Sequence, residues 1–212
     1  MNDKENFEQS KAALLEEYYD LQSEDVILQK ELYAHFGLLF FKFSLVEHSL
    51  INVLLFHNVG KSFHKGEIKS KVQWENSFDA EYEKACNLTL GNLIKRVLKI
   101  PEFSGFEAKL NELKQARDYF AHRFFRDEVG LYGNDEGIWI LLAEIARFRN
   151  MTMSVEKLLM PSFEKLCDRL GIPIPNDIQS EVLIRELKEE TLSSIRNDTV
   201  KFGWDERIDK IR

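Results

Sequence analysis

The chain has 212 residues, of which 44% are hydrophobic and 12% aromatic, so it can bury one substantial core. Its formal net charge of −7 excludes the global basic field of a protein that coats DNA or RNA, and any nucleic-acid contact must be local. Cys86 and Cys167 lie far apart in helical patterns, and the N-terminus is polar, without a secretory signal. We therefore expect reduced thiols in a cytoplasmic protein, with neither a disulfide nor a metal site.

The first part of the chain predicts an arm followed by a long core helix. Residues 1–23 are typical of an N-terminal arm or short helix. A helix is expected from Glu24 to about Val59, with Ser23 as its N-cap and Gly60 as its stop. Its apolar run resembles a membrane span, but charged and ionisable residues interrupt it and no uninterrupted segment is long enough to span a bilayer. We therefore expect a central core helix rather than a transmembrane helix. The interrupting residues are Lys42, Glu47 and His48.

The window 60–74 is the most basic in the chain and is expected to be a loop, with lysines at 61, 65, 69 and 71. A solvated surface and a phosphate-contacting patch are the two interpretations of such a run. Helices are predicted at 75–86 and again after Thr89, as far as Pro101.

The second half of the chain predicts two further long helices, at 104–127 and at about 138–170. The prolines that follow mark a boundary, after which 173–212 is expected to be a C-terminal helical extension. The fold class is therefore all-α, a bundle of four to five core helices over 24–172 with extra helices at both ends.

Arg117 is a permanent charge on a helix that is otherwise amphipathic. On a helical wheel it falls at the centre of the apolar stripe, whose members lie within roughly 60° of it: Phe106, Leu110, Leu113, Phe120, Ala121 and Phe124. Because an unpaired buried guanidinium costs several kcal/mol, Arg117 must have a partner. One interpretation is a salt bridge to Glu47 in the core helix. The other is that this part of the stripe faces a cleft or subunit interface, where the arginine binds an anion.

Asp118 and His122 share an edge of the same helix, one turn apart, and a hydrogen bond between them is expected. An imidazole can move a proton near neutral pH, and a guanidinium can hold a phosphate through two hydrogen bonds. These are sufficient parts for cleaving RNA without a metal or cofactor.

The stretch "RDYFAH", residues 117–122, resembles the motif of the HEPN superfamily, in which an arginine and a following polar residue precede a histidine by a few positions. The aromatic helix before it and the segment "TLGNLI" are also similar to HEPN sequences, and the resemblance covers about 30–170. It implies a HEPN-like bundle and a metal-independent endoribonuclease that works as a homodimer. His122 would be the general acid or base, Arg117 would bind phosphate, and Asp118 would orient one of them.

The resemblance also implies a partner and a setting. Family members act in toxin-antitoxin pairs and in phage defence, often held inactive by a cognate antitoxin or regulatory protein. Some carry a tyrosine two residues after the histidine that the antitoxin modifies, whereas here that position is Phe124. We expect a dimer on physical grounds as well, because the apolar stripe of the motif helix needs a second cover.

Local cations would have to collect the RNA substrate, and the expected substrate-binding residues are Lys95, Arg96, Arg123 and Arg126. The alternative function is a catalytically silent HEPN-like binding or scaffolding module, with Arg117 in a structural salt bridge. The net charge of −7 fits that alternative slightly better. A helix near 177–196 that drives oligomerisation is compatible with either.

Overall fold

The computed structural model describes residues 27–172, together with Arg185 and Glu189. The chain divides into two units, Met1–Ile172 and Pro173–Arg212. The expected arm at 1–23 and its cap Ser23 lie outside the described residues. Of the expected C-terminal extension, only Arg185 and Glu189 are described, and both are helical.

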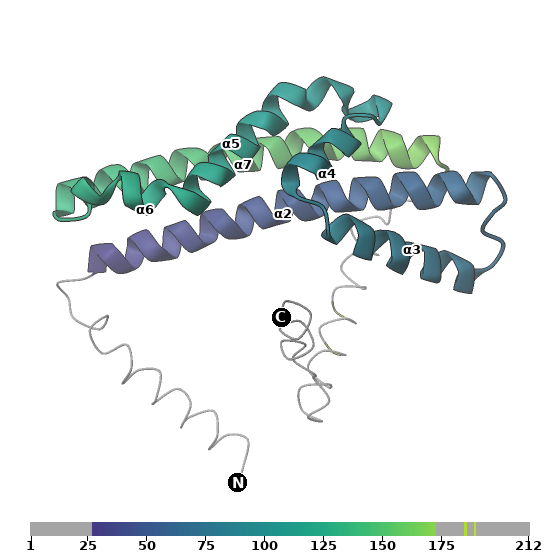
Figure 1. Cartoon of the computed structure of the whole chain (residues 1–212), viewed down its shortest axis with the longest axis horizontal. Coiled ribbons are helices and arrows are strands. Elements are labelled where there is room, and N and C mark those ends of the chain that lie inside the picture. Colours follow the sequence, from purple (N-terminus) through teal and green to yellow (C-terminus); the bar gives the residue numbers. More distant parts are fainter. Residues whose placement is uncertain (1–26, 173–184, 186–188, 190–212) are drawn as a thin grey trace, which may run out of the picture. The chain divides into compact units, whose positions relative to one another are not determined.

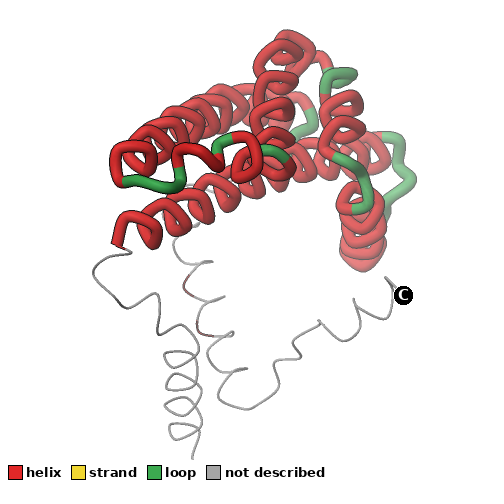
Figure 2. The backbone as a smooth tube through the Cα atoms, turned by 60° about the vertical axis from the view of Figure 1, so that its left-hand side comes forward, coloured by secondary structure: helices red, strands yellow, loops and turns green. Residues whose placement is uncertain are grey.

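Every regular element within 27–172 is a helix, which confirms the expected all-α bundle (Figure 2). The α-helices and the two 3-10 helices, η3 and η4, follow one another with short connections. In chain order they are α2 Ile27–His64, α3 Lys71–Cys86, α4 Leu90–Val97, η3 Pro101–Phe106, α5 Glu107–His122, α6 Phe124–Asp127, η4 Val129–Leu131 and α7 Asp135–Arg169.

The two longest helices, α2 and α7, lie side by side and run in the same direction (Figure 1). His64 Nε2 at the end of α2 donates to the carbonyl oxygen of Leu170 at 2.8 Å, so both helices finish at the same end of the bundle. Helix α3 returns along the later half of α2, where the rings of Phe56 and Phe78 meet at 6.0 Å. Helix α5 runs back against α7 toward α6 (Figure 1).

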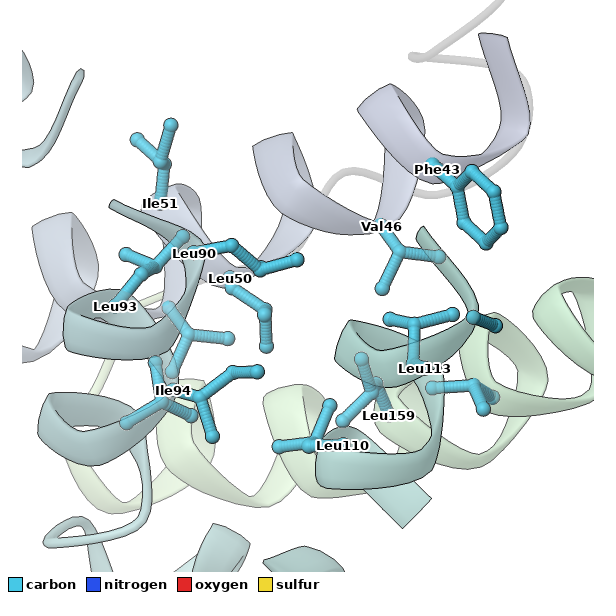
Figure 3. Close-up of a cluster of buried hydrophobic side chains, with 14 of the residues drawn as sticks. Phe43, Val46, Leu50, Ile51, Leu90, Leu93, Ile94, Leu110, Leu113 and Leu159 are labelled. Atoms are coloured by element: carbon cyan, nitrogen blue, oxygen red, sulfur yellow. The ribbon is translucent and has the colours of Figure 1, made fainter. Parts of the chain in front are cut away.

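One apolar core joins these helices, and it fixes how α4 and α5 sit on the α2 and α7 pair. Figure 3 shows Leu50 of α2, Leu93 of α4, Leu113 of α5 and Leu159 of α7 turned toward one another. Each of these four side chains is at most 3% exposed. Burying a leucine stabilises the fold by about 1.5–3 kcal/mol, so the core is what holds α5 in place.

Three helices begin at side-chain caps. Ser70, Thr89 and Asn134 each have an extended backbone, and each accepts a hydrogen bond from the backbone N–H three residues on. The predicted helix after Thr89 is confirmed at its start, but it ends at Val97 rather than at Pro101. The long helix predicted at 138–170 begins slightly earlier, at Asp135.

The predicted stop at Gly60 is wrong, because α2 continues to His64. Gly60 is buried against the end of α7, and a β-carbon there would lie 2.9 Å from Leu170 Cδ1. The glycine is therefore a packing residue, and the chain turns only at Gly66, where φ is +72°. The expected loop at 60–74 is in consequence mostly helical, split between the end of α2 and the start of α3.

By length and composition, α2 could cross a membrane, with a mean hydropathy of 1.6 over its most apolar window. Eleven of its residues are buried among the other helices. That pattern favours the interpretation of α2 as a core helix of the bundle.

Glu102 of η3 and Arg169 of α7 form an ion pair that ties the two elements together. Arg169 Nε lies 2.5 Å from Oε1 of Glu102, and Nη2 lies 3.2 Å from Oε2. The hydrogen bond from Arg169 lowers the pKa of Glu102, whose side chain is 13% exposed. Because Arg169 is 43% exposed, water screens the pair, and its loss is expected to cost about 1–2 kcal/mol.

Glu102→Gln is therefore expected to lower the free energy of unfolding at pH 7 by about 1–2 kcal/mol in urea titrations. The pKa of Glu102 is lower in the folded state, so its contribution is complete above the ordinary glutamate pKa and disappears as pH falls through the folded value. The difference in the free energy of unfolding between wild type and variant should therefore become smaller in acid. Glu75→Gln, in an exposed pair with Lys71, is the control with little effect. A difference independent of pH would contradict this assignment.

Candidate active site

Helix α5 is anchored by an apolar stripe that the chain itself covers. Leu110, Leu113, Ala116 and Phe120 are all at most 5% exposed and pack on the core formed with α2, α4 and α7. Two expectations are therefore wrong. Arg117 lies at the edge of the stripe rather than at its centre, and the stripe needs no second subunit to cover it.

The expected continuous helix at 104–127 is also wrong, because it breaks at Arg123, where φ is −129° and ψ is −33°. The break allows Phe124 to enter the core, where it is fully buried and its ring lies 4.8 Å from that of Phe120. Ala121, predicted on the stripe, is exposed. The consequence for the site is that His122 is the last residue of α5 and is exposed to solvent.

Arg117 is half-buried, with 35% of its side chain exposed. Its Nη1 lies 3.4 Å from Oδ1 of Asp118, and this is its ion pair among the described residues. The expected salt bridge to Glu47 is wrong. A guanidinium has five N–H donors, and one long contact leaves most of them free to bind an anion.

Asp118 is held by two cations of its own helix. Lys114 Nζ lies 2.5 Å from Oδ2 and Arg117 approaches the other oxygen. The hydrogen bond from Lys114 lowers the pKa of the Asp118 carboxyl, which therefore stays ionised at neutral pH. No hydrogen bond joins Asp118 to His122 in the described part of the chain, so the expected contact is absent. Asp118 orients Arg117 here, rather than the imidazole.

Arg123, which follows His122 in the chain, and Arg126 share one carboxylate. Their Nε atoms lie 2.9 Å and 3.0 Å from the two oxygens of Asp127, whose pKa they lower through these hydrogen bonds, that from Arg126 most strongly. Both arginine side chains are mostly exposed, at 63% and 71%. Two guanidinium groups on one carboxylate leave this group of three with a net positive charge.

Lys95 and Arg96 are both exposed on α4, but they lie toward different neighbouring helices. Lys95 lines a groove between α4 and α5, whereas the charge of Arg96 acts on Glu81 of α3. The structure therefore brings Lys95 toward the motif helix and separates Arg96 from it. Lys114 was missed in the sequence, although its spacing of four residues before Asp118 is the signal for such a pair.

Among the described residues, no group of three or more histidine, cysteine, aspartate and glutamate side chains is placed to hold a metal ion. Cys86 is exposed and Cys167 is buried, both as free thiols.

Comparison with known proteins gives no relative. No family model matches the chain, and no curated protein or solved structure does so either. The resemblance to the HEPN superfamily therefore stays a prediction from the sequence motif.

Proposed function

We propose that the protein is a metal-independent endoribonuclease of the HEPN type. The observation that carries the proposal is that Arg117 and His122 are both accessible to solvent in the last two turns of α5, and that most guanidinium donors of Arg117 are unused. A cation that served only to stabilise the core would instead be buried with its hydrogen bonds satisfied.

The chemistry needs a base, an acid and a cation. The 2′-hydroxyl of RNA loses a proton to a base while its oxygen bonds to the adjacent phosphorus. The bond from phosphorus to the 5′-oxygen breaks, and that oxygen takes a proton from an acid, leaving a 2′,3′-cyclic phosphate and a 5′-hydroxyl. His122 is the proton carrier, and Arg117 stabilises the charge on the phosphoryl oxygens.

A single imidazole begins the reaction either neutral or protonated, so it cannot be both base and acid at once. Two copies of His122 at a homodimer interface would supply both. Exposed apolar side chains lie beside the site and are suited to such an interface: Phe125 at 37%, Tyr33 at 48% and Val129 at 67% exposed. The rings of Tyr33 and Phe125 are 6.3 Å apart, which makes them one patch.

The biological setting that fits is a cytoplasmic toxin or phage-defence nuclease restrained by an antitoxin or regulatory protein. Control by modification of a tyrosine two residues after the histidine does not apply, because Phe124 stands there and is fully buried.

The test is incubation of the purified protein with single-stranded RNA in EDTA, with its mass measured by light scattering. We expect a dimer that produces fragments ending in 2′,3′-cyclic phosphate. An RNA carrying 2′-deoxyribose at the cut position should stay intact. A folded wild-type protein that leaves RNA uncut in EDTA would refute the proposal, and a monomer that cuts RNA would refute the composite site.

A catalytically silent binding module is the second candidate. It is favoured by the contacts of Asp118, which pairs with Lys114 and with one donor of Arg117 and so satisfies part of their charge within the chain. That candidate predicts no cleavage under any ionic condition, and Arg117→Ala would then act on stability alone.

A further inference from the structure

A groove of about 490 Å³ lies between α4 and α5, and one of its lining residues, Lys114, contacts Asp118 of the motif. Side chains and backbone from both helices line it, and none of the described lining residues is acidic. The main contributors are Gly91, Asn92 and Lys95 of α4 with Asn111, Lys114 and Gln115 of α5. In a chain with a net charge of −7, a groove with two lysines and no carboxylate is a local basic feature.

Gly91 shapes the groove. A β-carbon at this position would lie 3.1 Å from Cε of Lys114, so the glycine lets the lysine stem cross the first turn of α4. Thr89 accepts a hydrogen bond from the backbone N–H of Asn92, so that donor is already used. The attraction for an anion therefore comes from the lysine side chains, above all from Lys95, rather than from the helix end.

The groove lies on the same face of α5 as Asp118 and His122. Asn111, Lys114, Gln115, Asp118 and His122 are spaced by the intervals that place residues on the same side of a helix. At 1.5 Å per residue, the distance along the axis from Asn111 to His122 is about 16 Å. Because a nucleic-acid strand advances by about 3.4 Å or more per nucleotide, this length suits a short run of nucleotides.

The two lysines have different partners. Lys95 makes no ion pair with another described residue, so its ammonium is free for a phosphate. Lys114 already contacts Asp118 at 2.5 Å, so a phosphate in the groove would share it with the carboxylate that orients Arg117. The amides of Asn111 and Gln115 both donate and accept hydrogen bonds, which suits the edge of an unpaired base.

We propose that this groove binds a phosphate and an adjacent unpaired base of single-stranded RNA next to the cut, with Lys95 as the phosphate contact. The proposal deepens the proposed nuclease function and rests on it. It adds a substrate-binding groove to the candidate active site.

The test measures binding separately from cleavage, with the full chain, in EDTA, and a fluorescent single-stranded RNA made uncleavable by 2′-deoxyribose. Each phosphate contact contributes about 0.7 to the salt slope, so Lys95→Ala is expected to weaken binding about fivefold at ~0.1 M salt. Lys95→Arg should retain the affinity. Lys109→Ala, an exposed lysine of α5 outside the groove, is the matched control and should leave the affinity unchanged.

Equal losses of RNA affinity in Lys95→Ala and Lys109→Ala, or no loss in either, would overturn the assignment of the groove as an RNA-binding site. Displacement of the RNA by a mononucleotide at micromolar concentration would instead identify a small phosphate ligand and overturn the assignment to RNA. A wild type that binds the uncleavable RNA through Lys95 but never cuts ordinary RNA would refute the nuclease function while leaving the groove as an RNA site.

Discussion

Replacing His122 by alanine is expected to lower the rate of RNA cleavage by about 10²–10⁴-fold without unfolding the protein. The side chain ends α5 in solvent and makes no hydrogen bond with another described residue, so its removal takes nothing from the core. The lost function is proton transfer to and from the RNA. The measurement is the single-turnover rate in EDTA with a labelled single-stranded RNA, alongside circular dichroism.

His48→Ala is the matched control for this prediction. His48 is also an exposed helical histidine, on α2, and its ring contacts Tyr82 at 6.0 Å. Its removal should leave the cleavage rate unchanged. If His122→Ala cut RNA as fast as wild type, the proton carrier would have to be another residue and the site assignment would fail.

Gly137→Ala is expected to cause the largest loss of stability, about 2–4 kcal/mol. A β-carbon at Gly137 would overlap the backbone carbonyl group of Leu131, which belongs to η4 and has no flexible end to move aside. The N–H of Gly137 also donates to Oδ1 of the cap residue Asn134 at 2.8 Å. Relieving the overlap would shift the start of α7 and break this cap.

Urea unfolding followed by circular dichroism measures this effect. Gly133→Ala is the control in the same connection, because a β-carbon there meets nothing within 4 Å. Its effect should stay within about 0.5 kcal/mol. Similar stabilities for the two variants would show that the start of α7 adjusts freely, contrary to the packing described above.

The helices α3, α4 and α7 could be predicted from the sequence because local signals agree with the tertiary structure. The sequence predicts a helix that starts after Thr89, and in the structure Thr89 is the N-cap of α4. The apolar spacing of α7 continues through Pro161 without a break in the helix. Gly60 misled the prediction, because a glycine that permits close packing and a glycine that ends a helix are identical in sequence.

The break at Arg123 could not be predicted, because its cause is tertiary. Phe124 enters a cluster of rings from α2 and α5, including Phe36 at 5.6 Å and Phe120 at 4.8 Å. A wheel that treats 104–127 as one helix counts Phe124, which lies beyond the break, as a member of the stripe. This moves the apparent centre of the stripe toward Ala121, whereas Ala116 is the buried alanine.

The helical wheel could not predict the partners of the motif residues either. Asp118 has a possible partner one turn away on each side, and helical spacing treats Lys114 and His122 alike. The lysine carries a permanent charge, which an imidazole lacks, and it therefore attracts the carboxylate more strongly. Arg117 was likewise assigned to Glu47 on a premise of full burial, which its 35% exposure removes.

The most direct measurement of the central claim is the cleavage rate of Arg117→Ala in EDTA, compared with wild type and with Arg147→Ala. Arg147 is a helical arginine with 71% of its side chain exposed, outside the motif, and should be replaceable without effect. Loss of a donor aimed at the developing phosphoryl charge is expected to lower the rate by about 10²–10³-fold in Arg117→Ala. A rate equal to that of wild type, in a folded variant, would contradict the assignment of Arg117 and the end of α5 to the active site.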